Sequence, residues 1–352
     1  MLFKSEWEAT KTLMTQWWAG NASRPLLQVT APRDGAPAIR PYTAWEFLHY
    51  RDNPQEAITI FVNWAAHTFF GGVAYPHLRL NIGPVALAAQ ISGYLSYDAA
   101  TQTAWFEQEL EWEAIEQMAL KEENSWWAYT REIAALAASA APSKFIVSTA
   151  SLGGIHDVLA SFRGTQTLLM DMFTDAERIE AQHGWIEDAW HTVYDTINEL
   201  THWQEQGTSA WMGLWCAEQW YPLQSDYCAM ISPRDFERFV LPSLQRQAEK
   251  ITYPLFHLDG PGQLPHLDMM LAMPKLCGIQ WVPGAGNPPC EDPSYYPVYE
   301  KILEADKLLV LQSFDDPNSV RQVFHDFPSG RVLATVNCTS ESSARELLSA
   351  VS

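Results

Sequence analysis

The sequence feature that most constrains the fold is a series of short apolar segments in the C-terminal half. Four of them read as strands, at residues 253–259, 276–282, 307–313 and 331–337. They are nearly continuous apolar runs, as expected where both faces of a strand are buried. The segments between them have helix length or turn chemistry and are long enough for crossovers. The pattern therefore predicts an α/β fold with a parallel sheet.

Further strands are predicted nearer the N-terminus, at 24–32, 77–84, 144–150 and 209–216. Eight strands with such connections predict a (β/α)8 TIM barrel, formed as a single domain over residues 1–352. Helices are predicted at 5–20 and 57–70, and the first makes residues 1–23 a helical N-terminal extension. A doubly wound open sheet is the alternative, but no GxGxxG or GxxxxGK[ST] loop follows any predicted strand.

Composition narrows the range of partners. The formal net charge is −20, which disfavours nucleic acid and anionic membranes as partners. No signal peptide and no apolar run long enough to span a bilayer is recognised, and the five cysteines form no CxxC pair. A reducing, cytoplasmic location is expected. The sixteen tryptophans either fill space between helices and barrel or line a pocket for a flat or apolar ligand.

A TIM barrel places its active site at the carboxyl ends of the strands, so polar residues there are the candidates for function. The candidate catalytic residues are Asp259, Asp226 and Glu218. The candidate substrate-binding residues are Arg33, Asn81, Tyr227, Gln280, Trp281 and Asn337.

A metal site is one interpretation of this set. His257 and Asp259 lie two apart at the end of one predicted strand, so they share a face, and Cys338 follows the last strand. Imidazole, carboxylate and thiolate are all zinc ligands, and a catalytic zinc takes three protein ligands and one open position. In the alternative interpretation, His257 and Asp259 bond each other and Cys338 is buried filler.

Several segments together resemble the uroporphyrinogen decarboxylase superfamily. They read "DYCAMISPRDFERFVLP", "FHLDGPGQLPHLDMMLAMPKLCGIQWVPGAGNPP" and "SGRVLATVNC", with a weaker match at "PHLRLNIGPVALAAQISG". The resemblance covers about half of the chain and implies a (β/α)8 barrel. One branch of that superfamily decarboxylates uroporphyrinogen without a cofactor. The other consists of zinc-dependent methyltransferases that move a methyl group between a corrinoid protein and a thiol.

The methyltransferase branch is the closer resemblance. Its His-x-Cys motif reads His257-Leu258-Asp259 here, and its last-strand cysteine corresponds to Cys338. The resemblance therefore implies zinc as cofactor, a corrinoid protein as partner and a small acceptor, with Asp259 replacing one thiolate. The decarboxylase branch has an arginine-rich first strand end, where this chain has Arg33 alone.

Three functions follow as hypotheses. The first is a zinc-dependent methyltransferase. The second is a metal-free decarboxylase or lyase, with Asp259 or Asp226 as acid/base and with Arg33 and His257 orienting a carboxylate. The third is a non-catalytic protein that binds a small ligand in the barrel mouth.

Overall fold

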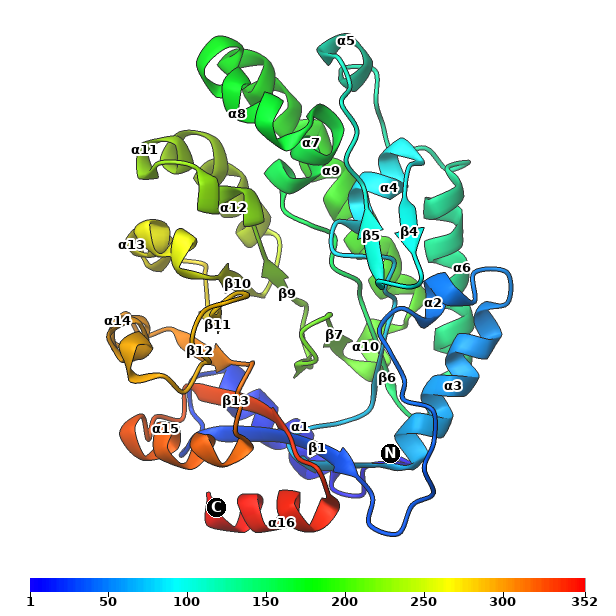
Figure 1. Cartoon of the computed structure of the whole chain (residues 1–352), viewed down its shortest axis with the longest axis vertical. Helices are drawn as coiled ribbons and strands as arrows, with labels where there is room; N and C mark the ends of the chain where they lie inside the picture. Colours follow the sequence, from blue (N-terminus) through cyan, green and yellow to red (C-terminus); the bar gives the residue numbers. More distant parts are fainter. Residues whose placement is uncertain (352) are drawn as a thin grey trace.

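A seven-stranded sheet forms the centre of the computed structural model, which describes residues 1–351 (Figure 1). Its strands in sheet order are β2 (Thr68–Gly72), β1 (Leu26–Pro32), β13 (Val332–Asn337), β12 (Leu308–Leu311), β11 (Gly278–Val282), β10 (Tyr253–Asp259) and β9 (Trp220–Leu223). All neighbours in this sheet pair in parallel except β1 and β2, which are antiparallel. The four strands predicted in the C-terminal half are confirmed.

The remaining strands form small separate pairs. They are β3 (His77–Arg79) with β6 (Ile146–Ser148), β4 (Ser96–Asp98) with β5 (Thr103–Trp105), and β7 (Thr208–Ser209) with β8 (Trp215–Cys216). A backbone hydrogen bond of 3.0 Å from Thr149 to Ser209 links the end of β6 to β7. Within the described residues no backbone ladder joins these pairs to the seven-stranded sheet. The fold is mixed α/β, and the predicted closed eight-stranded barrel is not shown.

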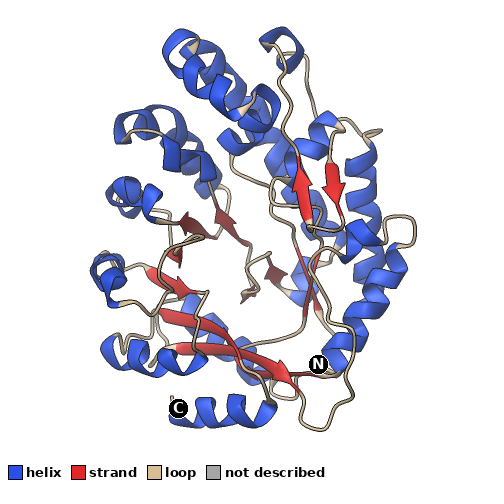
Figure 2. Ribbon diagram, in the orientation of Figure 1, coloured by secondary structure: helices blue, strands red, loops and turns tan. Residues whose placement is uncertain are grey.

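Helices form the outer layer around the strands (Figure 2). They are α2 (Glu46–His49), α3 (Pro54–Ala66), α4 (Ala86–Ser92), α5 (Trp112–Ile115), α6 (Ser125–Ala140), α7 (Ile155–Arg163), α8 (Thr165–Thr174), α9 (Ala176–Leu200), α10 (Trp203–Gln206), α11 (Pro233–Asp235), α12 (Leu241–Glu249), α13 (Leu267–Leu271), α14 (Tyr296–Glu304), α15 (Val320–Asp326) and α16 (Glu341–Ala350). Short helical turns η1 (Asp226–Met230), η3 (Pro261–His266) and η4 (Pro293–Tyr295) follow β9, β10 and β11. None of the helices in residues 1–351 is both long enough and apolar enough to cross a membrane.

The predicted N-terminal helix forms as α1 (Trp7–Trp18) and covers the amino ends of the strands. The Trp18 indole donates to the carbonyl of Trp215 at 2.8 Å and packs against Trp220 and Tyr253, the first residues of β9 and β10. Aromatic side chains therefore cover the amino ends of β9 and β10. A binding or catalytic site is expected at the carboxyl ends of the strands.

Two sequence predictions were wrong because short strands interrupt the expected pattern. The helix predicted at 57–70 ends at Ala66, and its last residues enter β2, where Gly72 approaches the carbonyl of Leu27 too closely for any side chain. The strand predicted at 209–216 is instead the hairpin of β7 and β8, which turns at Gly213 with a φ of 75°. The next strand of the main sheet is β9, which was not predicted.

Candidate active site

Three side chains with metal-ligating atoms meet at the carboxyl ends of β9 and β10. Asp226 opens η1 directly after β9, and His257 and Asp259 end β10. One ligand atom from each lies within 4.8 Å of the other two. His257 and Asp259 approach because alternate residues of a strand share a face, and Asp226 joins them because β9 and β10 are parallel neighbours. The cluster thus offers one imidazole and two carboxylates on the same side of the sheet.

A chain of hydrogen bonds fixes the orientation of the His257 ring. The backbone carbonyl of Met212 accepts from the Gln312 amide nitrogen at 3.1 Å, which leaves the Gln312 amide oxygen to accept from Gln280. The Gln280 amide oxygen then faces Nδ1 of His257 at 2.5 Å. Because an amide oxygen can only accept, the proton of a neutral His257 lies on Nδ1. Nε2 then carries the lone pair, and the carboxylate of Asp259 lies 4.0 Å from this nitrogen.

The same polar layer continues around the sheet. Gln312 also donates to Thr335 on β13 at 3.1 Å, and Thr335 donates to Gln28 on β1 at 3.0 Å. Gln28 in turn donates to the carbonyl of Gly213, in the β7–β8 turn, at 3.0 Å. This series of hydrogen bonds therefore links His257 to strands β11, β12, β13 and β1 and, through Gln28, to the β7–β8 turn.

Two buried side chains hold the loops that carry the carboxylates. Asp157, at the start of α7, accepts backbone N–H groups of Gly154, Asp226 and Tyr227 at 2.8–3.1 Å. Gln263 of η3 accepts the backbone N–H of Asp259 at 3.1 Å and donates to the carbonyl of Ser225 at 3.3 Å. Asp157 therefore holds the backbone of Asp226 from a distant segment, and Gln263 ties the end of β10 to the carbonyl of Ser225.

The electrostatics of the site are dominated by crowded acids. Loss of hydration, together with the carboxylates of Asp157 and Asp259, raises the pKa of Asp226 to about 8. The Asp226 side chain still reaches solvent on one side, but protein atoms surround the rest of it. Burial also raises the pKa of Asp157 and lowers the pKa of His257, so a neutral imidazole is favoured. A cation would relieve this repulsion between carboxylates.

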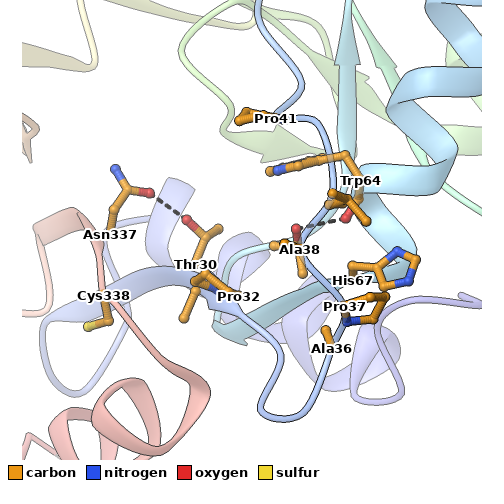
Figure 3. Close-up of a pocket in the computed structure, with 13 residues that line it drawn as sticks. Thr30, Pro32, Ala36, Pro37, Ala38, Pro41, Trp64, His67, Asn337 and Cys338 are labelled. Atoms are coloured by element: carbon orange, nitrogen blue, oxygen red, sulfur yellow. Dashed lines mark hydrogen bonds between the residues drawn. The ribbon is translucent and has the colours of Figure 1, made fainter.

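Asp226 also borders a cavity of about 320 Å³ between α7, η1 and the β4–β5 hairpin. Its walls include Asp157, Tyr227 and Phe106. A second cavity, of about 510 Å³, lies at the carboxyl ends of β1 and β13 (Figure 3). There Asn337 accepts a 2.5 Å hydrogen bond from Thr30.

Cys338 is not part of the cluster formed by Asp226, His257 and Asp259. It lines the 510 Å³ cavity beside β13, and burial raises the pKa of its thiol while Ser343 of α16 bonds it. Cys338 follows β13, which ends at Asn337, and both residues line this cavity. The structure therefore places Asp226, and not Cys338, beside His257 and Asp259.

The other predicted residues have varied positions. Glu218 precedes β9 and is exposed at the amino end of the strands, the side opposite to the cluster. Trp281 is fully buried against Tyr295 of η4, on the face of β11 opposite to Gln280. Neither residue therefore lies beside Asp226, His257 and Asp259: Glu218 lies at the opposite strand end, and Trp281 faces the helices.

Three predicted substrate-binding residues have structural surroundings of their own. Arg33 follows β1 and lies near Glu341 of α16, whose pKa it helps to lower. Asn81 is buried and caps its own turn through the N–H of Gly83. Tyr227 is buried, its ring stacks on His156, and its hydroxyl has no hydrogen-bond partner within residues 1–351.

Sequence reasoning missed Asp157, Gln263 and Trp211. The Trp211 ring, from the β7–β8 turn, meets the His257 ring edge-on with centroids 5.0 Å apart. Asp157 follows two glycines at a helix start, which is a capping signal that was available in the sequence. The contacts of Gln263 and Trp211 depend on chain segments far away, and no local pattern indicates them.

Comparison with known proteins supports the fold. No protein-family model matches the chain, and neither does any curated protein sequence. Among solved structures, the chain is similar to a methyltransferase from Methanosarcina mazei, with a TM-score of 0.58, 97% of each chain covered and 11% sequence identity. At this identity the similarity shows a shared α/β fold, and function has to be argued from the site.

Proposed function

We propose that this chain is a metal-dependent methyltransferase, with zinc held by Asp226, His257 and Asp259. The observation that carries the proposal is the cluster itself, in which a histidine with an oriented Nε2 lone pair faces two carboxylates at the strand ends. The shared fold with a methyltransferase of Methanosarcina mazei supports it. The predicted ligand set of His257, Asp259 and Cys338 is revised accordingly.

The residues present fit such a metal. Zinc accepts imidazole nitrogen and carboxylate oxygen, and three protein ligands leave a position open for substrate. A metal-bound histidine usually donates its other ring N–H to an acceptor, and Gln280 provides that acceptor here. A set of one nitrogen and two oxygen donors is harder than a thiolate set, so it suits an oxygen or nitrogen acceptor as well as a thiol.

The chain's own groups would perform the remaining work. The bound metal would lower the pKa of the acceptor group and present it as a nucleophile. Gln280 holds the His257 ring, while Asp157 and Gln263 hold the loops of the two carboxylates. The edge of Trp211 limits water on one side of His257. A corrinoid protein as methyl donor remains part of the proposal, on the sequence resemblance alone.

The first test is metal content. Protein purified without chelators should carry about one equivalent of zinc, or bind it on titration. His257→Ala and Asp226→Asn should lower the affinity, and Cys338→Ser serves as the matched control that leaves it unchanged. The second test follows methyl transfer from methylcobalamin to small thiols and alcohols. If wild-type protein binds less than about a tenth of an equivalent of zinc, the proposal is wrong.

A metal-free decarboxylase or lyase is a second candidate, and one observation favours it. Asp226, with its raised pKa, is protonated near neutral pH and faces a cavity, so it is suited to act as a general acid. The two functions differ in their metal dependence. Full activity of chelator-treated protein on a small carboxylated substrate would support the lyase and exclude the zinc proposal.

A further inference from the structure

Arg79 is a cation at the carboxyl end of β3 whose side chain has no anionic partner. It ends β3 and is only partly exposed, and its side chain has no hydrogen bond or salt bridge with any of residues 1–351, although its guanidinium lies over the Trp211 ring. Its Nε is completely buried without a partner. Removal of a guanidinium from water without such partners is unfavourable.

Other buried cations of this chain are satisfied. Lys4 donates to the carbonyls of Phe70 and Gly72 at 2.9 and 2.7 Å. Arg163 bonds Asp171 at 2.7 Å and also pairs with a glutamate. The unpaired state of Arg79 therefore distinguishes it from cations that serve the fold.

Arg79 lies close to the cluster of Asp226, His257 and Asp259 through a shared neighbour, Trp211. Its guanidinium carbon lies 5.7 Å from the centre of the Trp211 indole, and the His257 ring lies 5.0 Å from the same indole. Arg79 and His257 thus both lie against Trp211. Tyr42, whose hydroxyl is also buried without a partner, is close enough to Arg79 for its pKa to respond to that charge.

We propose that Arg79 binds the carboxylate of a small anionic substrate, whose other end lies across Trp211 at the cluster of Asp226, His257 and Asp259. A guanidinium binds a carboxylate through two parallel N–H donors, and the Tyr42 hydroxyl is available as a further donor. The acceptor in the proposed methyl transfer is then a small carboxylate with a nucleophilic group at the far end. This inference deepens the proposed function and rests on it for the chemistry at the cluster.

Carboxylate binding is tested on metal-free protein, so that the result does not depend on methyl transfer. The probes are butyrate and benzoate, with butyramide and benzamide as neutral matches, followed by ligand-observed NMR and thermal unfolding. Wild-type protein should bind the acids and ignore the amides. Arg79→Gln should weaken acid binding about tenfold or more, since it removes charged hydrogen bonds. Arg51→Gln is the matched control, because the Arg51 guanidinium lies over Trp126, 3.9 Å from the ring centroid, and not over Trp211.

The stability of the same variants gives an independent result. An arginine kept for ligand binding costs stability in the empty protein, so Arg79→Gln should have an unfolding temperature equal to or above that of the wild type. Arg79→Lys, which keeps the charge and loses the planar fork, should fold and bind the acids weakly. Unchanged acid binding by Arg79→Gln, or amides bound as well as acids, overturns the proposal. Zinc titration of the same variants, in separate samples, distinguishes this failure from failure of the metal site.

Discussion

Replacement of Gln280 tests whether the hydrogen-bond chain beneath His257 prepares it to bind metal. Gln280 is 1% exposed and bonds both His257 and Gln312. Gln280→Leu leaves Nδ1 of His257 and the amide oxygen of Gln312 without partners. Each unsatisfied buried group costs about 1–3 kcal/mol, so the free energy of unfolding should fall by about 2–6 kcal/mol. Loss of the acceptor for a metal-bound histidine should lower zinc affinity by about 10–100-fold.

Gln280→Glu separates these two effects. The carboxylate still accepts from Nδ1 of His257, so zinc affinity should be equal to or above that of the wild type. The bond to Gln312 is lost, so the free energy of unfolding should fall by about 1–3 kcal/mol. Affinity is measured by competition with a chromophoric chelator, and stability by urea unfolding. If both variants bind zinc as the wild type does, the orienting role of Gln280 is refuted.

Three further predictions concern the cluster and its support. Asp226→Asn should lower zinc affinity at least about tenfold, whereas Cys338→Ser should leave it unchanged, as measured by the same competition. Asp157→Ala should lower the free energy of unfolding by about 2–4 kcal/mol in urea, because three backbone N–H groups lose their acceptor. Burial lowers the pKa of His183 to about 4. Between pH 6.5 and pH 4 the unfolded chain therefore binds a proton at this ring while the folded protein does not, so the free energy of unfolding falls as the pH falls. His183→Gln should therefore reduce the loss of stability between pH 7 and pH 4.5 by about 2 kcal/mol.

Each of these predictions has a result that contradicts it. If Asp226→Asn and Cys338→Ser lower zinc affinity equally, Cys338 is a zinc ligand as well and the ligand set proposed here is wrong. Wild-type stability of the Asp157 variant would show that water replaces its contacts at no cost. An unchanged pH profile of unfolding in the His183 variant would show that this ring is protonated in the folded protein.

The sequence alone determined the parallel strands of the C-terminal half. Continuous apolar runs separated by helix-length segments admit few other folds, because both faces of each strand must be covered. It also determined that His257 and Asp259 share a face, since alternation along a strand is local. Local pattern was weakest at 209–216, where a hairpin turn interrupts an apolar run.

Only the tertiary structure decided which residues complete the site. Asp226 reaches His257 because β9 lies beside β10, and β9 was not evident from the sequence. Asp157 meets the loop of Asp226 across about seventy residues of chain. Only the tertiary structure shows that the side chain of Arg79 has no anionic partner and could bind the carboxylate of a substrate. Such contacts depend on packing between distant segments, which residue spacing does not encode.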